Sequence, residues 1–321
     1  AVALYLSDSR LRVGCLHPDP LSLILERVLM KRDSSKASIQ VKTRSLWAQV
    51  AHEIVKDKIS LASLLAVVFL LLMAIFAPLI TPYRYDQAIF TEAHQPPSWR
   101  HLMGTDLIGR DLLSRVIYGA RVSLSIAVIV QLIGVAIGVP LGVIAGFYGG
   151  LIDQLIMRFV DTMLAFPILL VVILIMVVLG PGYINVLIGL GMTSWLQICR
   201  LTRGGVLDVR ESEFVIAARA IGASDFRIIL KHIVPNVLSP IIVTVVLGIP
   251  QTIFREASLS FIGIGITPPT PSWGQMVGEY YLLIQAYWWM PLFPALMIGI
   301  TMLFFTLLGD KLQDALALGR K

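Results

Sequence analysis

The chain of 321 residues is 57% hydrophobic and only 14% charged, with a mean hydropathy of +0.82. Soluble domains carry about 25% charged residues, so this composition excludes an ordinary soluble protein and indicates a protein that lies in lipid. The formal net charge of +6 does not call for nucleic acid as a partner, because membrane topology explains it better.

Residues 1–58 form a polar tail with ten Lys and Arg residues, and we do not expect a signal peptide in it, because its one apolar run, 21–30, is short and interrupted by charge. Met30, followed by Lys31 and Arg32, resembles a natural start, so we expect residues 1–29 to be an extension rather than a domain. Residues 47–58 predict an amphipathic helix at the inner membrane interface. Its apolar side consists of Trp47, Val50 and Ile54, and its basic side consists of Lys56 and Lys58.

Six stretches are apolar enough to cross a bilayer, which takes roughly 20 residues per helix. We expect spans at about residues 59–80, 121–147, 155–179, 183–203, 236–259 and 289–309. Helices satisfy their own backbone hydrogen bonds in hydrocarbon, so the sequence predicts an all-α membrane protein with six transmembrane helices.

Three of these spans carry further signals. The second has glycines at four-residue intervals, a stripe that favours close helix packing over the lining of a path; they are Gly134, Gly138, Gly142 and Gly146. The third begins with Arg158 and Asp161, which we expect to pair. The fifth holds Pro240, Gly248 and Pro250, which predict a kinked or partly unwound helix.

Residues 81–120 form a loop between the first two spans. Its charged residues can pair with one another, so we expect a self-satisfied turn and helix that positions the second span; they are Asp106, Arg110, Asp111 and Arg115. An external contact is the alternative role for this loop.

Residues 213–236 are the one long polar and amphipathic segment within the membrane part of the chain. Ser212 is a plausible N-cap, after which Phe214, Ala218 and Ile221 recur on one helical face. Gly222 permits a turn, after which Ser224 and Asp225 can cap a second short helix. This helix carries Phe226, Ile229 and Ile233, and we expect it to end at Pro235. Two short helices joined at a glycine, with Ala217 and Ala218 exposed, suit the cleft of another protein; an ordinary loop lying on its own bundle is the alternative.

Charge asymmetry fixes the predicted orientation. With the N-terminus inside, the inner segments hold twenty Lys and Arg residues and the outer segments hold six. The positive-inside bias therefore predicts cytoplasmic N- and C-termini and a cytoplasmic 204–235 loop.

Segment 213–236 resembles the characteristic cytoplasmic loop of permease subunits of binding-protein-dependent ABC importers. That loop reads Glu-Ala-Ala, three residues, Gly, nine residues, then a hydrophobic pair ending in Pro, and Ala217, Ala218, Gly222 and Pro235 are in register. Ile216 replaces the usual Glu, a charge that Glu213 can supply from one turn earlier. The resemblance implies that this loop contacts an ATPase through Glu213, Phe214, Ala217, Ala218, Arg219, Gly222, Ala223, Ser224, Phe226 and Pro235.

Two further segments, residues 101–124 and 257–274, resemble the dipeptide, oligopeptide and nickel permeases, and together the three segments indicate the second, C-type branch of that family. The resemblance implies a type I importer permease fold in a bacterial or archaeal cell membrane. It also implies a heterodimer with a related permease, two cytoplasmic ATPase subunits and an extracytoplasmic solute-binding protein. Contact with that binding protein is the alternative role for the 81–120 loop. ATP and Mg would be bound by the ATPase chains, with no cofactor or metal in this one.

The expected organisation is a tail at 1–58, a transmembrane domain at 59–309 and a cytoplasmic tail at 310–321. The sequence contains no phosphate-binding Gly-x-x-x-x-Gly-Lys-Ser/Thr loop and no His-Glu-x-x-His or Gly-x-Ser-x-Gly motif, which argues against an enzyme. Peptide import is the predicted function; import of nickel or another chelated metal is the alternative. A stand-alone ion-coupled carrier is the alternative from another class, although the predicted span centres lack the acids or bases that it would need.

Overall fold

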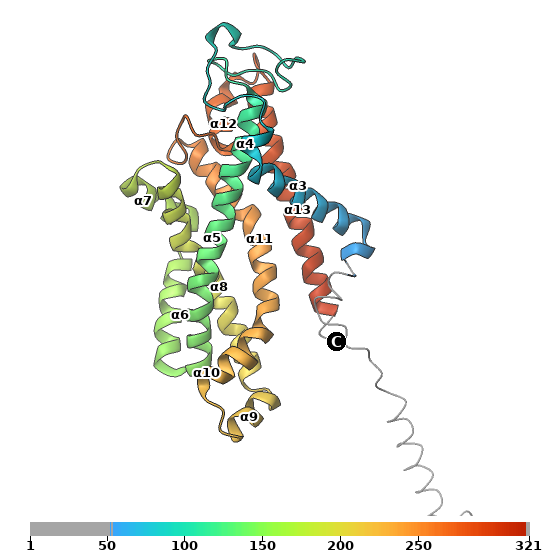
Figure 1. Cartoon of the computed structure of the whole chain (residues 1–321). Coiled ribbons are helices and arrows are strands. Elements are labelled where there is room, and N and C mark those ends of the chain that lie inside the picture. Colours follow the sequence, from blue (N-terminus) through green and yellow to red (C-terminus); the bar gives the residue numbers. More distant parts are fainter. Residues whose placement is uncertain (1–51, 53, 319–321) are drawn as a thin grey trace, which may run out of the picture. The chain divides into compact units, whose positions relative to one another are not determined.

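The computed structural model describes residue 52 and residues 54–318, and in that part every regular element is a helix (Figure 1), which confirms the all-α prediction. In chain order the α-helices are α3 (Lys58–Ile75), α4 (Ala77–Ile80), α5 (Leu112–Tyr148), α6 (Gly150–Leu164), α7 (Ile168–Leu179), α8 (Tyr183–Arg210), α9 (Glu213–Ala220), α10 (Asp225–Ile228), α11 (Val234–Phe261), α12 (Trp273–Tyr280) and α13 (Trp289–Leu318). The short helices η1 (Phe90–Glu92), η2 (Ile229–Ile233) and η3 (Tyr281–Leu283) complete the described elements. The predicted extension at 1–29 and half of the predicted interfacial helix, residues 47–51 and 53, fall outside the described residues.

Among the described residues, five helices are long and apolar enough to span a membrane, and the pair α6 and α7 supplies a sixth candidate. We predicted one uninterrupted span over 155–179, but α6 and α7 are bent by 85° at the break between them. Pro167 lies at the N-cap of α7 with an extended ψ of 115°. Because proline also lacks a backbone N–H, the helix ends before it and restarts in a new direction.

The fifth span is not unwound, although we predicted a kinked or partly unwound helix. Residues Asp225–Phe261 run as one continuous helical segment through α10, the π-helical turn η2 and α11. Pro235 therefore does not stop the helix, and Pro240 and Pro250 lie inside α11 without unwinding it. Pro235 lies in the first turn of α11, just after the π turn η2, a position where a proline is tolerated because its missing N–H would have no partner within the α-helix.

The glycine stripe of α5 packs closely against another helix, as predicted, and that helix is α8. A Cβ on Gly138 would lie 2.7 Å from the Trp195 carbonyl oxygen, and one on Gly146 would lie 2.8 Å from Cβ of Val206. Only residues without a side chain allow two helix backbones to approach this closely.

Two ion pairs join α6 to α8. Arg203 Nη2 lies 2.6 Å from Asp153 Oδ2, and Arg200 pairs with Asp161. Our prediction that Asp161 pairs with Arg158 is therefore wrong. The two aspartates of α6 therefore pair with arginines of a neighbouring helix and not with an arginine of their own helix.

The two polar ends of the described part are made by different segments. The loop after α4 gathers with α12 at one end, and α9 and α10 lie at the opposite end (Figure 1). This separation agrees with the charge bias, which assigns these ends to opposite sides of the membrane. The helix α8 extends to Arg210 and α13 extends to Leu318, past the ends predicted at 203 and 309.

Candidate functional site

A tight turn at Gly222 joins α9 to α10. Gly222 has a φ of +82°, its N–H donates to the Arg219 carbonyl (3.0 Å), and the Ala223 N–H donates to the Ala218 carbonyl (3.1 Å). This pair of bonds is the Schellman arrangement, in which a residue of positive φ ends a helix. Ser212 and Ser224 occupy the N-cap positions of the two helices, but neither side chain accepts a capping hydrogen bond.

Both short helices are anchored to the membrane bundle by their buried faces. Val215 and Ala218 of α9 and Ile228 of α10 lie in one apolar cluster with Phe147 of α5 and Val206 of α8. The Arg219 guanidinium lies 5.6 Å above the centre of the Phe147 ring, a cation–π contact that fixes α9 further. The two helices and the ends of α5 and α8 therefore form one packed unit.

The exposed part of these helices carries large apolar side chains. Ile221 is 86% exposed, Phe226 is 73% exposed, and Ile216 is exposed beside them. We call this the α9–α10 surface and define it as Glu213, Phe214, Ile216, Ala217, Arg219, Ile221 and Phe226, all of which are exposed. Exposed apolar patches of this kind are typical of protein interaction sites.

Most residues predicted for this site are accessible. The exposed ones are Glu213, Phe214, Ala217, Arg219, Gly222, Ser224, Phe226 and Pro235, while Ala223 is half-buried. Ala218 is only 7% exposed, so the apolar face of α9 that packs on the bundle contains Val215 and Ala218, not Phe214 and Ile221. Ile216 and Ile221 were not predicted as surface residues. The sequence feature that could have identified them is that each is a large apolar residue beside the buried pair Val215 and Ala218.

A second candidate site, the central pocket, lies among α5, α7, α8 and α11 and has a volume of about 180 Å³. Its polar lining is mostly uncharged, from Gln131, Thr193, Ser194, Gln197, Thr244 and Gln251, and its one charged residue is Arg255. Gln131 is buried and its Nε2 donates to Thr252 Oγ1 at 2.8 Å, which ties α5 to α11. This site was not predicted, although its signal is visible in the sequence as amide side chains within otherwise apolar spans.

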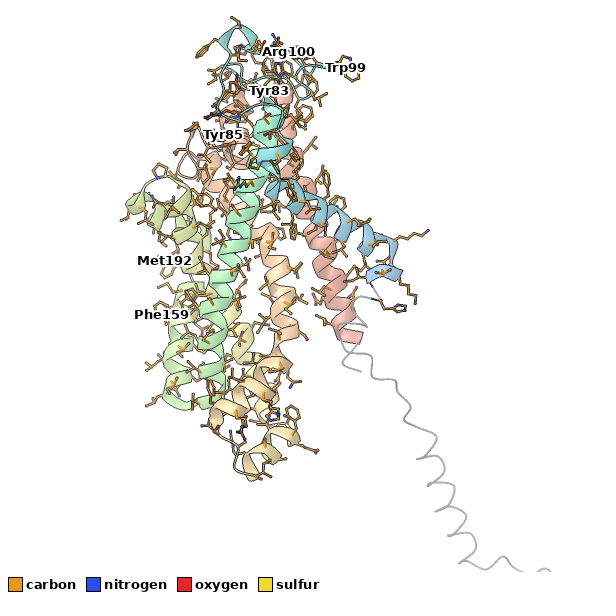
Figure 2. The ribbon with its side chains drawn as sticks, viewed as in Figure 1. Tyr83, Tyr85, Trp99, Arg100, Phe159 and Met192 are labelled. Carbon is orange, nitrogen blue, oxygen red and sulfur yellow. The ribbon has the colours of Figure 1, made fainter. Side chains whose placement is uncertain are left out.

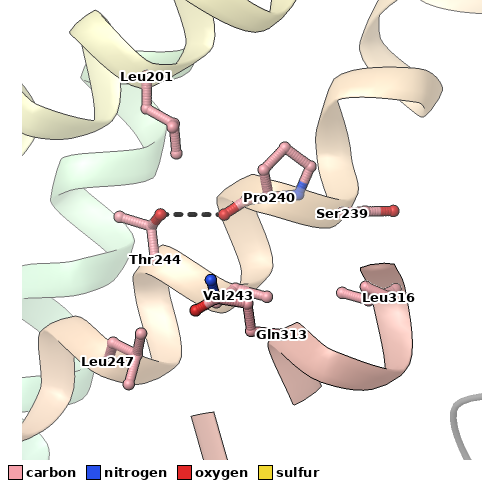
Figure 3. A pocket seen from close by; sticks show the side chains of 8 residues that line it. All are labelled: Leu201, Ser239, Pro240, Val243, Thr244, Leu247, Gln313 and Leu316. Carbon is pink, nitrogen blue, oxygen red and sulfur yellow. Dashed lines mark hydrogen bonds between the residues drawn. The ribbon is translucent and has the colours of Figure 1, made fainter. Parts of the chain in front are cut away.

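A further pocket of about 360 Å³, which we call the inner pocket, lies between α8, α11 and α13 (Figure 3). Its lining is mainly aliphatic, with Ser239, Thr244 and Gln313 as polar members. Thr244 and Leu247 line both the central and the inner pocket. The central pocket and the inner pocket therefore lie next to one another along α11.

The loop at the other end of the bundle is held by a buried network of charges. Asp106 Oδ2 accepts from Arg110 Nε at 2.5 Å and from the Tyr280 hydroxyl at 3.0 Å, and it lies 3.7 Å from Arg115 Nε. Burial raises the pKa of the Tyr280 phenol, which keeps its proton for this bond. Asp111 pairs with His101 instead of an arginine (2.9 Å). This network bears out the predicted pairing of Asp106 with Arg110 and Arg115, whereas Asp111 pairs with His101. The loop is not satisfied by its own residues alone, because Arg110 and Arg115 also pair with Glu279 of α12 (2.9 and 3.5 Å).

The outer surface of this loop carries Trp99, whose side chain is 99% exposed, and Arg100 (Figure 2). Arg100 Nη2 lies 2.6 Å from Glu92 Oε1, so its charge is paired within the loop.

Sequence comparisons agree with this geometry. The family described as the binding-protein-dependent transport system inner membrane component matches residues 138–320, and the N-terminal TM domain of oligopeptide transport permease C matches residues 45–97. The dipeptide transport system permease protein DppC of Bacillus subtilis (strain 168) is 40% identical over 300 residues, covering 93% of this chain and 92% of that protein. The oligopeptide transport system permease protein OppC of the same organism is 41% identical over 278 residues, covering 87% and 91%. The glutathione transport system permease protein GsiD of Shigella flexneri serotype 5b (strain 8401) is 42% identical over 274 residues, covering 85% and 90%.

Solved structures share the fold. Two crystal forms of inward-facing conformations of the MetNI methionine ABC transporter match with TM-scores of 0.53 and 0.52, at 17% and 18% identity. Each match covers 64% of this chain, and 97% or 96% of the other. The predicted type I importer permease fold is therefore confirmed, in a protein that crosses the membrane several times. The chain belongs to the family of binding-protein-dependent transport system inner membrane components.

Proposed function

We propose that this chain is one of two permease subunits of an ATP-driven importer of peptides. A solute-binding protein delivers the peptide on the outer side, and two ATPase subunits, which bind ATP and Mg, supply the energy on the inner side. The observation that carries this proposal is the exposed α9–α10 surface, packed rigidly onto the spanning helices at the end with the basic charge bias.

The packing of this surface supports a mechanical role. A partner that moves Ile221 and Phe226 also moves the buried residues of the same helices, because Ala218 and Ile228 belong to one apolar cluster with Phe147 of α5. Packed helices transmit such a displacement as a rigid-body rotation rather than absorbing it. When ATP binds between the ATPase subunits, the resulting movement therefore switches the opening of the path from one side of the membrane to the other.

The central and inner pockets support the role of α11 in lining the path. They follow one another along this helix, and their lining is mainly uncharged. A passage of this kind suits peptides of varied side chains, as the names of the related dipeptide and oligopeptide permeases suggest. The related second permease would complete the path from the opposite side.

Crosslinking tests the coupling role. Cysteines at Ile221 and Phe226, paired with cysteines in the ATPase cleft, are expected to form disulfides whose yield changes when ATP binds. Ile228→Cys is the matched control on the same pair of helices, because Ile228 is fully buried. Equal yields at Ile221, Phe226 and Ile228, or no disulfide at either exposed position, would contradict the proposal.

Uptake into proteoliposomes tests the substrate class. We expect the purified complex to import radiolabelled tri-alanine only with its binding protein and ATP. Import of chelated nickel instead would favour the metal alternative, and import by this chain without ATPase subunits would identify an ion-coupled carrier.

A further inference from the structure

The central pocket contains a single charge. Arg255 is partly accessible and forms no hydrogen bond or salt bridge with any residue that the structure describes. The adjacent acid, Glu256, does not neutralise it, because Glu256 is fully buried and accepts hydrogen bonds from Ser123, Ser260 and Ser272. The pocket therefore presents a guanidinium without a described partner near the C-terminal end of α11, a spanning helix in which an unpaired charge is costly.

The rest of the polar lining offers both donors and acceptors. Gln197 and Gln251 are exposed, and neither side chain is hydrogen-bonded within residues 54–318. The Thr193 and Ser194 hydroxyls donate to carbonyls of their own helix at 3.1 and 3.0 Å, so their oxygens remain free to accept. This set matches the N–H and C=O groups of a peptide backbone.

The pocket is unsuited to cations. Its lining includes no His, Cys, Asp or Glu, the residue types that hold metal ions or ammonium groups. An anionic ligand is the remaining complement to Arg255, and the planar guanidinium fork matches a carboxylate with two parallel hydrogen bonds.

We infer that Arg255 binds the C-terminal carboxylate of the transported peptide in the central pocket, while Gln197 and Gln251 bind its backbone. This inference rests on the proposed function. Every unmodified linear peptide has a terminal carboxylate and a backbone, whatever its side chains. A path that contacts only these groups holds a peptide in one orientation and remains indifferent to its sequence.

Photolabelling of the purified transporter complex tests the inference without the binding protein, whose own preferences would otherwise interfere. The probe is tri-alanine carrying N-terminal benzoylphenylalanine, prepared as the free acid and as the C-terminal amide. We expect the free acid to label peptides from α8 and α11, with excess tri-alanine, but not tri-alanine amide, competing. R255Q should lower labelling by the free acid roughly tenfold, the loss typical of a hydrogen bond to a charged group, and leave the weak labelling by the amide unchanged.

Two further variants separate charge from folding. R255K keeps the positive charge and should retain more labelling than R255Q. R121Q removes an exposed arginine from α5, outside the pocket, and should label like the wild type. Equal labelling by acid and amide in the wild type, or no effect of R255Q on the acid, would overturn the inference. If the wild type still imports tri-alanine in proteoliposomes, such a result leaves the proposed function intact; absence of import would contradict the function itself.

Discussion

Gly142 of α5 faces the backbone of Cys199 in α8 so closely that a Cβ on Gly142 would lie 2.5 Å from the Cys199 carbonyl oxygen. The atom that it would strike belongs to the main chain, so a side-chain rotation cannot relieve the clash. Because α8 leads directly to α9, the separation of α5 and α8 also sets where the α9–α10 surface lies.

Gly142→Ala is therefore expected to push α5 and α8 apart and to destabilise the assembled protein by about 1–3 kcal/mol, as overpacking does. Gly204→Ala is the matched control, because Gly204 also lies in α8 but a Cβ there would have no atom within 4 Å. This control should gain helix stability of up to about 1 kcal/mol. The fraction of protein that stays monodisperse after heating in detergent measures both effects. Changes of the same sign in the two variants would argue against the close approach.

Gly222 tests the turn itself. No atom lies within 4 Å of a Cβ at this position, so the only cost of a side chain is its φ of +82°. Gly222→Val should strain the turn by about 1–3 kcal/mol and reduce peptide-stimulated ATP hydrolysis, while Gly222→Asn should retain more activity, since Asn tolerates this conformation. Equal activity of the Val and Asn variants would show that the turn geometry does not matter for coupling.

Glu256 organises the segment between α11 and α12. Its carboxylate accepts from the hydroxyls of Ser123 (3.1 Å), Ser260 (2.8 Å) and Ser272 (2.7 Å). Each of these hydroxyl oxygens in turn accepts a hydrogen bond from a backbone N–H. Ser260 accepts from Ile266 of the connecting segment, and Ser123 and Ser272 accept from Trp273 and Gln275 in the first turn of α12. One carboxylate thus holds residues 262–275 against α5.

Glu256→Ala should leave three buried hydroxyls without their acceptor and cost about 3 kcal/mol or more. We expect faster thermolysin cleavage within residues 262–272, measured by mass spectrometry of the purified protein. Glu256→Gln should behave nearly like the wild type, because its amide oxygen still accepts two of the bonds and Ser123 can accept from the amide nitrogen. Cleavage that is equally fast in the Gln and Ala variants would indicate that the negative charge, rather than the hydrogen bonds, holds the segment.

The sequence predicted features that depend on composition and local periodicity. Long apolar runs indicated the spanning helices, and the glycine spacing predicted a face of α5 that another helix approaches closely, because both depend on residues close together in the chain. That this helix is α8 was not predicted, because the choice of partner depends on the folded bundle. The predicted partner of Asp161 was wrong because the choice between Arg158 and Arg200 depends on how α6 packs on α8. The central pocket was missed for the same reason: Gln131, Gln197 and Gln251 lie far apart in the sequence and converge only in the folded bundle.

The two ion pairs between α6 and α8 provide a last prediction, since they differ in exposure. The Arg203 and Asp153 side chains are 33% and 15% exposed and share two hydrogen bonds (2.9 and 2.6 Å), whereas the Arg200 and Asp161 side chains are more than half exposed. Solvent and salt screen an exposed pair, so it contributes little. Asp153→Asn is expected to lower the apparent Tm of the detergent-solubilised protein, with a loss of about 1 kcal/mol. Asp161→Asn, on the same helix, should change it little, and a larger effect there would show that burial does not decide the strength of these pairs.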